Sequence, residues 1–151
     1  FTKSLHHILH IGNPVKIEGP YGQFNFSSNK PRQIWVGGGI GITPFIARMK
    51  RLAMHPDGKI IDLFHTTTVF DEEAIALLQR DADAAKVRLH VLTDGVDGLL
   101  TVERIIQAVP KWQSSDVWFC GPAGFGESLR RDFCARGLDS DDFHQELFAM
   151  R

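Results

Sequence analysis

Short β-rich segments alternate with amphipathic helical segments along most of this chain, and this alternation is the feature that most restricts its fold. Residues 33–36, 59–66, 87–93, 116–120 and 142–145 have the composition of strands. Helical patterns lie between them at 44–54, 71–85, 101–109 and 123–136. This order predicts an open α/β fold, a parallel sheet of about five strands with helices on both faces, because parallel neighbours need a crossover connection.

Composition indicates one well-packed domain and removes several classes of partner. The 151 residues are 43% apolar and include 11 phenylalanines, which is enough for one core. A net charge of -1 without long charged runs gives no indication of binding to nucleic acid or to an anionic membrane surface. No segment approaches the ~20 apolar residues of a membrane span. The two cysteines are too few for a disulfide framework or an iron–sulfur cluster, so we expect a reducing, cytoplasmic setting.

The first part of the chain predicts the remnant of a second unit. Residues 15–18 have the pattern of a strand that ends at Gly19-Pro20-Tyr21-Gly22, and the polar residues 25–30 resemble a linker. The chain opens FTKSL, with neither an initiator methionine nor a signal-peptide pattern. We therefore expect a fragment of a longer protein.

A glycine cluster, Gly37 to Gly41, follows the first strand of the sheet. Thr43 is placed as a helix N-cap and Pro44 as the first helical residue, so free N–H groups and the helix dipole would point into the loop. This predicts a bound anion; the alternative is a tight turn without a ligand. Pro44 stands where the common G-x-G-x-x-G fingerprint has its third glycine. A branched side chain at Gly39 or Gly41 is expected to fill the phosphate space while the fold survives.

Two further motifs accompany the cluster. The fourth strand ends in a second glycine turn, Cys120 to Gly124, which a helix follows. The chain then closes with FHQELFAMR, in which His144 and Glu146 alternate with Phe148. Both glycine turns would border one crevice at the carboxyl edge of the sheet, where parallel sheets bind their ligands.

Together these motifs resemble the ferredoxin–NADP reductase superfamily, in particular its ferric reductase and NADPH oxidase branch, over nearly the whole chain. The resemblance implies a Rossmann-like NAD(P)H-binding domain at residues 29–151 and a remnant of a flavin-binding β-barrel at residues 1–28. Residues 15–24 would form the last barrel strand, and Phe1-Thr2 the tail of the flavin-phosphate motif. The Arg-x-Tyr-Ser/Thr flavin motif of the family would lie upstream of Phe1.

The resemblance also implies the site residues. Catalytic roles go to Cys120 beside the nicotinamide, to the terminal acid Glu146 and to the flavin-stacking Phe148. The implied cofactor-binding residues are Thr2, Gly38, Gly39, Ile40, Gly41, Thr43, Pro44, Thr66, Thr93, Asp94, Cys120, Gly121 and Pro122. Two alternatives stay open: Cys120 as a small buried hydrophobe, and Phe148 as a residue that closes the hydrophobic edge of the sheet.

The implied activity is a relay in which NAD(P)H gives a hydride to FAD, which passes single electrons to another centre. The first interpretation is a ferric reductase: an upstream FAD domain and haem-bearing membrane helices in the same chain, with this domain on the cytoplasmic side of the inner membrane. The second is a soluble reductase for a ferredoxin or an oxygenase. The third is a non-catalytic nucleotide-sensing module, which would not need Cys120, Glu146 and Phe148.

Cofactor choice follows from charge. A 2′-phosphate normally needs arginine or lysine near the ends of the second and third strands. Those ends read Thr66-Thr67-Thr68 and Thr93-Asp94-Gly95, and Asp94 would repel a phosphate. NADH is therefore favoured over NADPH. Without the flavin motif, the chain alone is expected to be folded but colourless and to bind the dinucleotide weakly.

Other polar and aromatic residues have simpler interpretations. The histidines His6, His7 and His10 lack a further ligand set, so no metal site is predicted. Carboxylates at residues 71–73 suit the first turn of a helix. Trp35 and Trp118 lie inside strands and are expected in the core, as is Cys134 on its helix.

Overall fold

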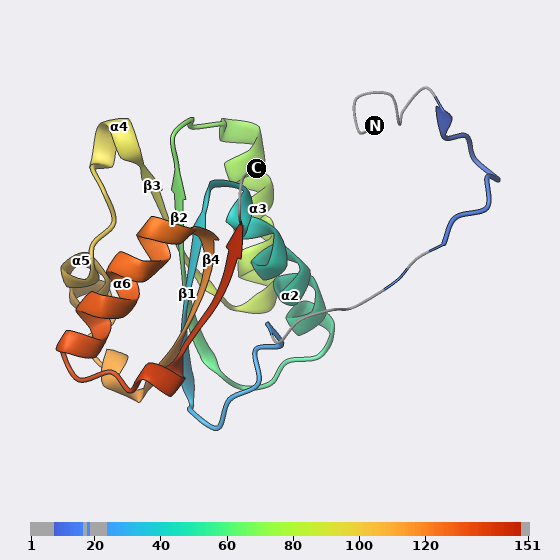
Figure 1. The fold of residues 1–151 in the computed structure, drawn as a ribbon. Coiled ribbons are helices and arrows are strands. Elements are labelled where there is room, and N and C mark those ends of the chain that lie inside the picture. Colours follow the sequence, from blue (N-terminus) through green and yellow to red (C-terminus); the bar gives the residue numbers. More distant parts are fainter. Residues whose placement is uncertain (1–7, 17, 19–23, 149–151) are drawn as a thin grey trace.

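The computed structural model describes residues 8–16, 18 and 24–148 and shows a five-stranded parallel sheet between helices (Figure 1). The strand order is β3-β2-β1-β4-β5. The strands are β1 (Arg32–Gly38), β2 (Ile60–Thr67), β3 (Arg88–Thr93), β4 (Ser115–Pro122) and β5 (Phe143–Phe148). The predicted open α/β sheet is confirmed.

Two pairs of helices cover the two faces of the sheet. Helices α2 (Thr43–Met54) and α3 (Glu72–Ala85) pack on one face. Helices α5 (Val102–Ala108) and α6 (Ala123–Ala135) pack on the other. Short helical turns complete the connections: η2 (Gly39–Ile42), α4 (Asp94–Asp97), η3 (Trp112–Ser114) and η4 (Ser140–Asp142).

The central strands are buried on both faces, which explains their nearly continuous apolar sequences. Alternate residues of β1 and β4 point to opposite faces. Val36 and Phe119 join the core under α5 and α6, while Trp35 and Trp118 join the core under α2 and α3. The predicted core positions of both tryptophans are confirmed.

Side-chain caps explain where two of the helices begin. The Asp71 carboxylate accepts the backbone N–H of Ala74 at 3.0 Å, so the acidic run at 71–73 starts α3 as predicted. The Thr101 hydroxyl accepts the N–H of Arg104 in the same way at the start of α5. Both caps follow loops at the carboxyl edge of the sheet and fix the direction in which the helices leave it.

The segment before β1 packs on the sheet. Phe26 is buried among Trp35, Phe45 and Trp118, and its carbonyl accepts a hydrogen bond from the Gln33 side chain at 3.0 Å. The strand expected at 15–18 is not found at residues 15, 16 and 18, and residue 17 lies outside the described residues. The domain division at 28 and 29 stays a prediction, although Phe26 packs with the α/β core.

The order of the strands places a topological switch point between β1 and β4. The chain builds outward from β1 through β2 to β3, then returns to the other side of β1 with β4 and β5. The loops that follow β1 and β4 therefore leave toward opposite faces. Open parallel sheets bind ligands in the crevice that this divergence creates.

Candidate functional site

The two glycine turns meet at this switch point, backbone against backbone. A Cβ atom added to Gly41 would lie 2.0 Å from the carbonyl oxygen of Cys120. One added to Gly121 would lie 3.2 Å from Cα of Gly38. Only glycine allows this approach, so the loop after β1 and the turn after β4 form one rigid edge of the crevice.

Gly39 has the opposite surroundings. Its φ of +55° lies in the left-handed region, and a Cβ atom added there would meet nothing within 4 Å. Gly39 thus faces open space, whereas Gly41 fills a packing position. The expectation that both glycines leave room for a phosphate is corrected for Gly41, where a side chain would collide with the main chain of β4.

The start of α2 also differs from expectation. The η2 turn runs directly into the helix, so Ile42 takes the N-cap position and Thr43 already has helical angles of φ -55° and ψ -48°. The Thr43 hydroxyl donates to the carbonyl oxygen of Ile40 at 2.8 Å instead of accepting an N–H group. Thr43 is therefore the first helical residue and Pro44 the second. The helical run begins at Gly39, so the first N–H groups of this run have no acceptor within the helix.

His65 supports the glycine loop from the neighbouring strand β2. Its ring is buried, and Nδ1 lies 3.1 Å from the carbonyl oxygen of Gly37. Burial lowers the pKa of His65, which keeps the ring neutral near pH 7. A neutral ring with Nδ1–H donating to Gly37 fixes the end of β1 without adding charge to the crevice.

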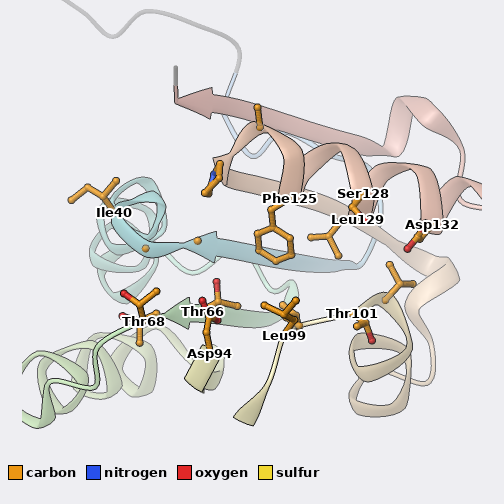
Figure 2. A pocket seen from close by; sticks show the side chains of 17 residues that line it. Ile40, Thr66, Thr68, Asp94, Leu99, Thr101, Phe125, Ser128, Leu129 and Asp132 are labelled. Atoms are coloured by element: carbon orange, nitrogen blue, oxygen red, sulfur yellow. The ribbon is translucent and has the colours of Figure 1, made fainter. Parts of the chain in front are cut away.

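A cavity of about 740 Å³ opens beside the glycine loop on the side of α6. Figure 2 shows Phe125 and Leu129 of α6 on one side, Leu99 and Thr101 opposite, and Ile40 at one end. Its lining comprises Gly38, Gly39, Ile40, Thr66, Thr67, Thr68, Asp94, Leu99, Leu100, Thr101, Val102, Pro122, Ala123, Phe125, Ser128, Leu129 and Asp132.

The polar groups of the cavity lie mainly near the strand ends. Hydroxyl groups of Thr66 and Thr68 and the carboxylate of Asp94 come from the ends of β2 and β3 (Figure 2). Asp132 lies at the far end, toward Thr101. Among the described residues that line the cavity, none is lysine, arginine or histidine. The cavity therefore combines apolar walls with hydroxyl and carboxylate groups.

The predicted site residues fall into groups. Those that line the cavity are Gly38, Gly39, Ile40, Thr66, Asp94 and Pro122. Those that the structure describes outside the lining are Gly41, Thr43, Pro44, Thr93, Cys120, Gly121, Glu146 and Phe148, while Thr2 lies outside the described residues. Sequence reasoning did not assign the wall at residues 99–102, or Phe125 and Leu129 of α6, to the site.

Cys120 lies on the other face of the sheet, in the core with Trp35, Phe45 and Trp118. It is fully buried, and burial raises the pKa of its thiol to about 11, with a further contribution from the Glu146 carboxylate. Its neutral thiol packs as a small apolar group. Cys120 contributes to the crevice edge through its carbonyl oxygen, which packs against Gly41, and not through its thiol.

The last strand brings the remaining predicted residues to the same edge. In the β4–β5 ladder Glu146 is paired with Cys120, and the backbone of Phe148 with Pro122. Glu146 is exposed. The backbones of the three predicted catalytic residues therefore lie together at the carboxyl ends of β4 and β5, outside the cavity lining, and their roles stay predictions.

Neither metal ligands nor a membrane span is found in the described part of the chain. Within residues 8–16, 18 and 24–148, no group of three or more His, Cys, Asp or Glu side chains is arranged to hold a metal ion. His10 is exposed, and the other two histidines of that run lie outside the described residues. No helix of the same residues is long and apolar enough to cross a membrane.

Comparison with known proteins finds relatives that are named as oxidoreductases. No sequence-family profile matches the chain. It is 31% identical over 147 residues to an NADPH oxidoreductase of Mycobacterium tuberculosis (strain ATCC 25618 / H37Rv), covering 92% of this chain and 37% of that protein. It is 28% identical over 149 residues to the vanillate O-demethylase oxidoreductase of Pseudomonas putida, covering 98% of this chain and 45% of that protein. The chain thus spans less than half the length of these relatives.

A solved structure has the same fold. The flavohem-like FAD/NAD-binding domain of nitric oxide dioxygenase from Vibrio cholerae O1 biovar El Tor superposes with a TM-score of 0.75 at 23% identity. The match covers 97% of this chain and 63% of that one. With its 3-2-1-4-5 sheet, its paired glycine turns and these relatives, the chain belongs to the ferredoxin–NADP reductase superfamily.

Proposed function

We propose that this chain is the nicotinamide-dinucleotide-binding part of a flavin-dependent oxidoreductase. The observation that carries the proposal is the cavity at the switch point, where Gly39 faces open space beside apolar walls and strand-end hydroxyls. A dinucleotide has the matching chemistry: a pyrophosphate for backbone N–H groups, riboses for hydroxyls and carboxylates, and an adenine ring for apolar side chains.

Different residues are proposed to contact different parts of the dinucleotide. Backbone N–H groups at Gly39 and Ile40, which line the cavity, would hold the pyrophosphate. Thr66 and Asp94 would bind the adenosine ribose, and Phe125 would pack on the adenine ring. The main chain of Cys120, Gly121 and Pro122 would border the nicotinamide, and Pro122 is the one of the three that lines the cavity.

FAD, bound by the domain that we propose to precede this one, would accept the hydride and release electrons singly. For their part, the residues of this chain orient the nicotinamide: Glu146 and Phe148 lie at the β5 end of the crevice edge. Phe148 is proposed to cover the flavin and to give way to the nicotinamide. This assignment rests on the family resemblance and on the backbone position of Phe148.

NADH is the proposed electron donor. Asp94 lies in the cavity, and no basic side chain is found among the described lining residues. A 2′-phosphate would be left near a carboxylate without a cation to pair with, which is electrostatically unfavourable. The ribose hydroxyls of NADH, in contrast, can donate to Asp94.

For the final electron acceptor we propose an iron protein, such as an oxygenase component or a haem domain. The supporting observation is similarity to the vanillate O-demethylase oxidoreductase and to a flavohem-like domain. A ferric chelate as acceptor, with haem-bearing membrane helices upstream and this domain on the cytoplasmic side, is the other proposal, and it rests on the sequence motifs alone.

Titration calorimetry of the 151-residue chain tests the proposal. NADH is expected to bind with a dissociation constant of ~0.1–1 mM, because the flavin that completes the pocket is absent. NADPH is expected to bind several-fold more weakly, and Asp94→Asn should reduce this difference. A chain without heat of binding for either dinucleotide at millimolar concentration contradicts the proposed function; tighter binding of NADPH contradicts only the choice of donor.

A second measurement distinguishes the proposed oxidoreductase from a non-catalytic nucleotide-sensing module. The chain alone should be colourless and should not transfer hydride, whereas adding the upstream FAD domain should give NADH-dependent flavin reduction. Binding of NADH without flavin reduction in the longer protein would favour the sensor.

A further inference from the structure

One wall of the cavity is a loop in which Leu100 is buried in the core under α5 and α6 but residues 95–99 are exposed. Between the end of β3 and the start of α5, the chain forms the single turn α4 and then residues 98–101. Val96 is 83% exposed and Leu99 is 72% exposed. Asp94, Leu99, Leu100 and Thr101 nevertheless line the cavity. Hydrophobic burial holds this loop at Leu100, so the exposed residues 97–99 need other contacts to fix their position.

Arg104 makes the contacts that fix it. Its Nη1 atom donates to three consecutive carbonyl oxygens, at 2.7 Å to Asp97, 3.4 Å to Gly98 and 3.2 Å to Leu99. Hydrogen bonds from a charged guanidinium are stronger than those between neutral groups. In the part of the chain that the structure describes, Arg104 forms no salt bridge, so these carbonyls are the acceptors that hold it.

Two more hydrogen bonds close the arrangement. The Asp97 carboxylate accepts the backbone N–H of Thr93 at 2.8 Å, which ties the loop to the end of β3. The Thr101 hydroxyl accepts the N–H of Arg104 at 3.4 Å, which ties the loop to the first turn of α5. Arg104 itself is not among the residues that line the cavity. It acts on the cavity through the main chain of residues 97–99.

We propose that Arg104 is a positioning residue for the nucleotide cavity: by holding the carbonyls of residues 97–99 it sets the wall against which the adenosine half of the dinucleotide packs. The inference rests on the proposed function. Leu99 lies opposite Phe125 across the cavity, and Asp94 lies at its strand-end side (Figure 2). Without Arg104 the three carbonyls would turn to water, and this wall would lose its fixed position.

The test compares Arg104→Met and Arg104→Lys with the unchanged chain, and Arg136→Met is the matched control. Arg136 also contacts α5, through an ion pair with Glu103, but it does not touch residues 97–99. Calorimetry would use three probes: NADH, ADP-ribose for the adenosine half, and nicotinamide mononucleotide for the other half.

Arg104→Met is expected to weaken NADH and ADP-ribose binding roughly fivefold to tenfold, by the loss of charged hydrogen bonds. Arg104→Lys should recover part of this affinity. Binding of the mononucleotide, and all binding by Arg136→Met, should be unchanged. Equal affinity of Arg104→Met and the unchanged chain for ADP-ribose overturns the inference, as does an equal loss for both half-ligands.

Amide hydrogen exchange without ligand keeps the inference separate from the proposed function. Residues 95–99 should exchange faster in Arg104→Met than in the unchanged chain or in Arg136→Met. If the unchanged chain binds no dinucleotide, the proposed function fails, and faster exchange still supports the anchoring of the wall. Unchanged exchange at these residues overturns the inference whatever the binding result.

Discussion

The carboxyl edge of the sheet is open on the α6 side and packed on the α2 side. On the open side, Gly39 borders a cavity of about 740 Å³ whose walls come from α6 and from the loop that Arg104 holds. On the packed side, Gly41 presses against the main chain of Cys120, whose thiol is buried among aromatic rings. Two glycines of one loop thus meet different needs: one gives access, the other allows two backbones to touch.

The largest effect is expected at the packed side. Gly41→Ala places a Cβ atom 2.0 Å from the Cys120 carbonyl oxygen and 2.5 Å from its carbonyl carbon. Neither backbone can move without displacing β1 or β4, so we expect the free energy of unfolding to fall by about 3 kcal/mol. Denaturant unfolding followed by circular dichroism measures it.

Gly124→Ala, in the other glycine turn, is the control for this change. An added Cβ atom there meets nothing within 4 Å, and the residue lies in the first turn of α6, so alanine should be neutral or slightly stabilising. A Gly41→Ala protein as stable as the unchanged chain would show that the two turns are not in contact.

The open side predicts lost binding instead of lost structure. Gly39→Val directs a branched side chain into the cavity and should weaken NADH binding about tenfold, which corresponds to about 1.4 kcal/mol. The positive φ adds about 1–2 kcal/mol of strain to the folded state. Calorimetry of the folded variant measures the affinity.

Gly58→Val separates strain from obstruction. Gly58 also has a positive φ, +77°, and open surroundings, but it precedes β2 at the amino edge of the sheet. It should lose stability and keep its affinity for NADH. If Gly39→Val bound NADH as well as Gly58→Val does, the loop would be a turn without a ligand.

The comparison also explains what could be predicted from the sequence. Apolar runs such as the one around Trp118 mark strands buried on both faces, and Asp71 marks a helix start by its own chemistry, so the fold follows from local patterns. The difference between Gly39 and Gly41 cannot be predicted from local patterns, because it depends on where β4 lies. The N-cap was misplaced at Thr43 because a 3₁₀ turn, which the glycines permit, starts the helical run earlier.

The far wall of the cavity was missed for a related reason. Leu99 and Leu100 follow α4 without a strand or helix pattern, and the carbonyl of Leu99 is held by Arg104, several residues further along. Loop walls held by one long side chain have no sequence periodicity. The available sequence signal was Arg104, a basic residue in the first turn of a helix that Thr101 caps, because such a side chain can reach back to the preceding loop.

A smaller effect is expected from the Cys120 thiol. Its folded pKa of about 11 lies above that of an unfolded thiol, about 8.5, so the unfolded chain loses this proton first as pH rises. The contribution of Cys120 to stability is complete below pH ~8.5 and is lost as pH approaches about 11. Unfolding midpoints at pH 8 and pH 10.5 should therefore differ less in Cys120→Ala than in the unchanged chain.

Alkylation gives an independent check of the same burial. At pH 8 iodoacetamide should modify Cys134, which is partly exposed, and leave Cys120 unmodified until denaturant is added. Mass spectrometry of peptides from the treated chain distinguishes the two sites. Rapid modification of Cys120 in the native protein would mean that the packed side opens in solution.

The smallest effect is expected at Thr43, where the open and packed sides join. Its hydroxyl donates to the Ile40 carbonyl oxygen at 2.8 Å on the protein surface, so Thr43→Val should cost about 1 kcal/mol of unfolding free energy. Thr43→Ser keeps the hydroxyl and should retain most of this stability, which denaturant titration resolves. NADH affinity should be nearly unchanged in both variants, because Thr43 does not line the cavity. A Thr43→Val chain that keeps its stability but loses affinity would instead mean that the hydroxyl turns to the dinucleotide, the role that a helix N-cap at this position was expected to play.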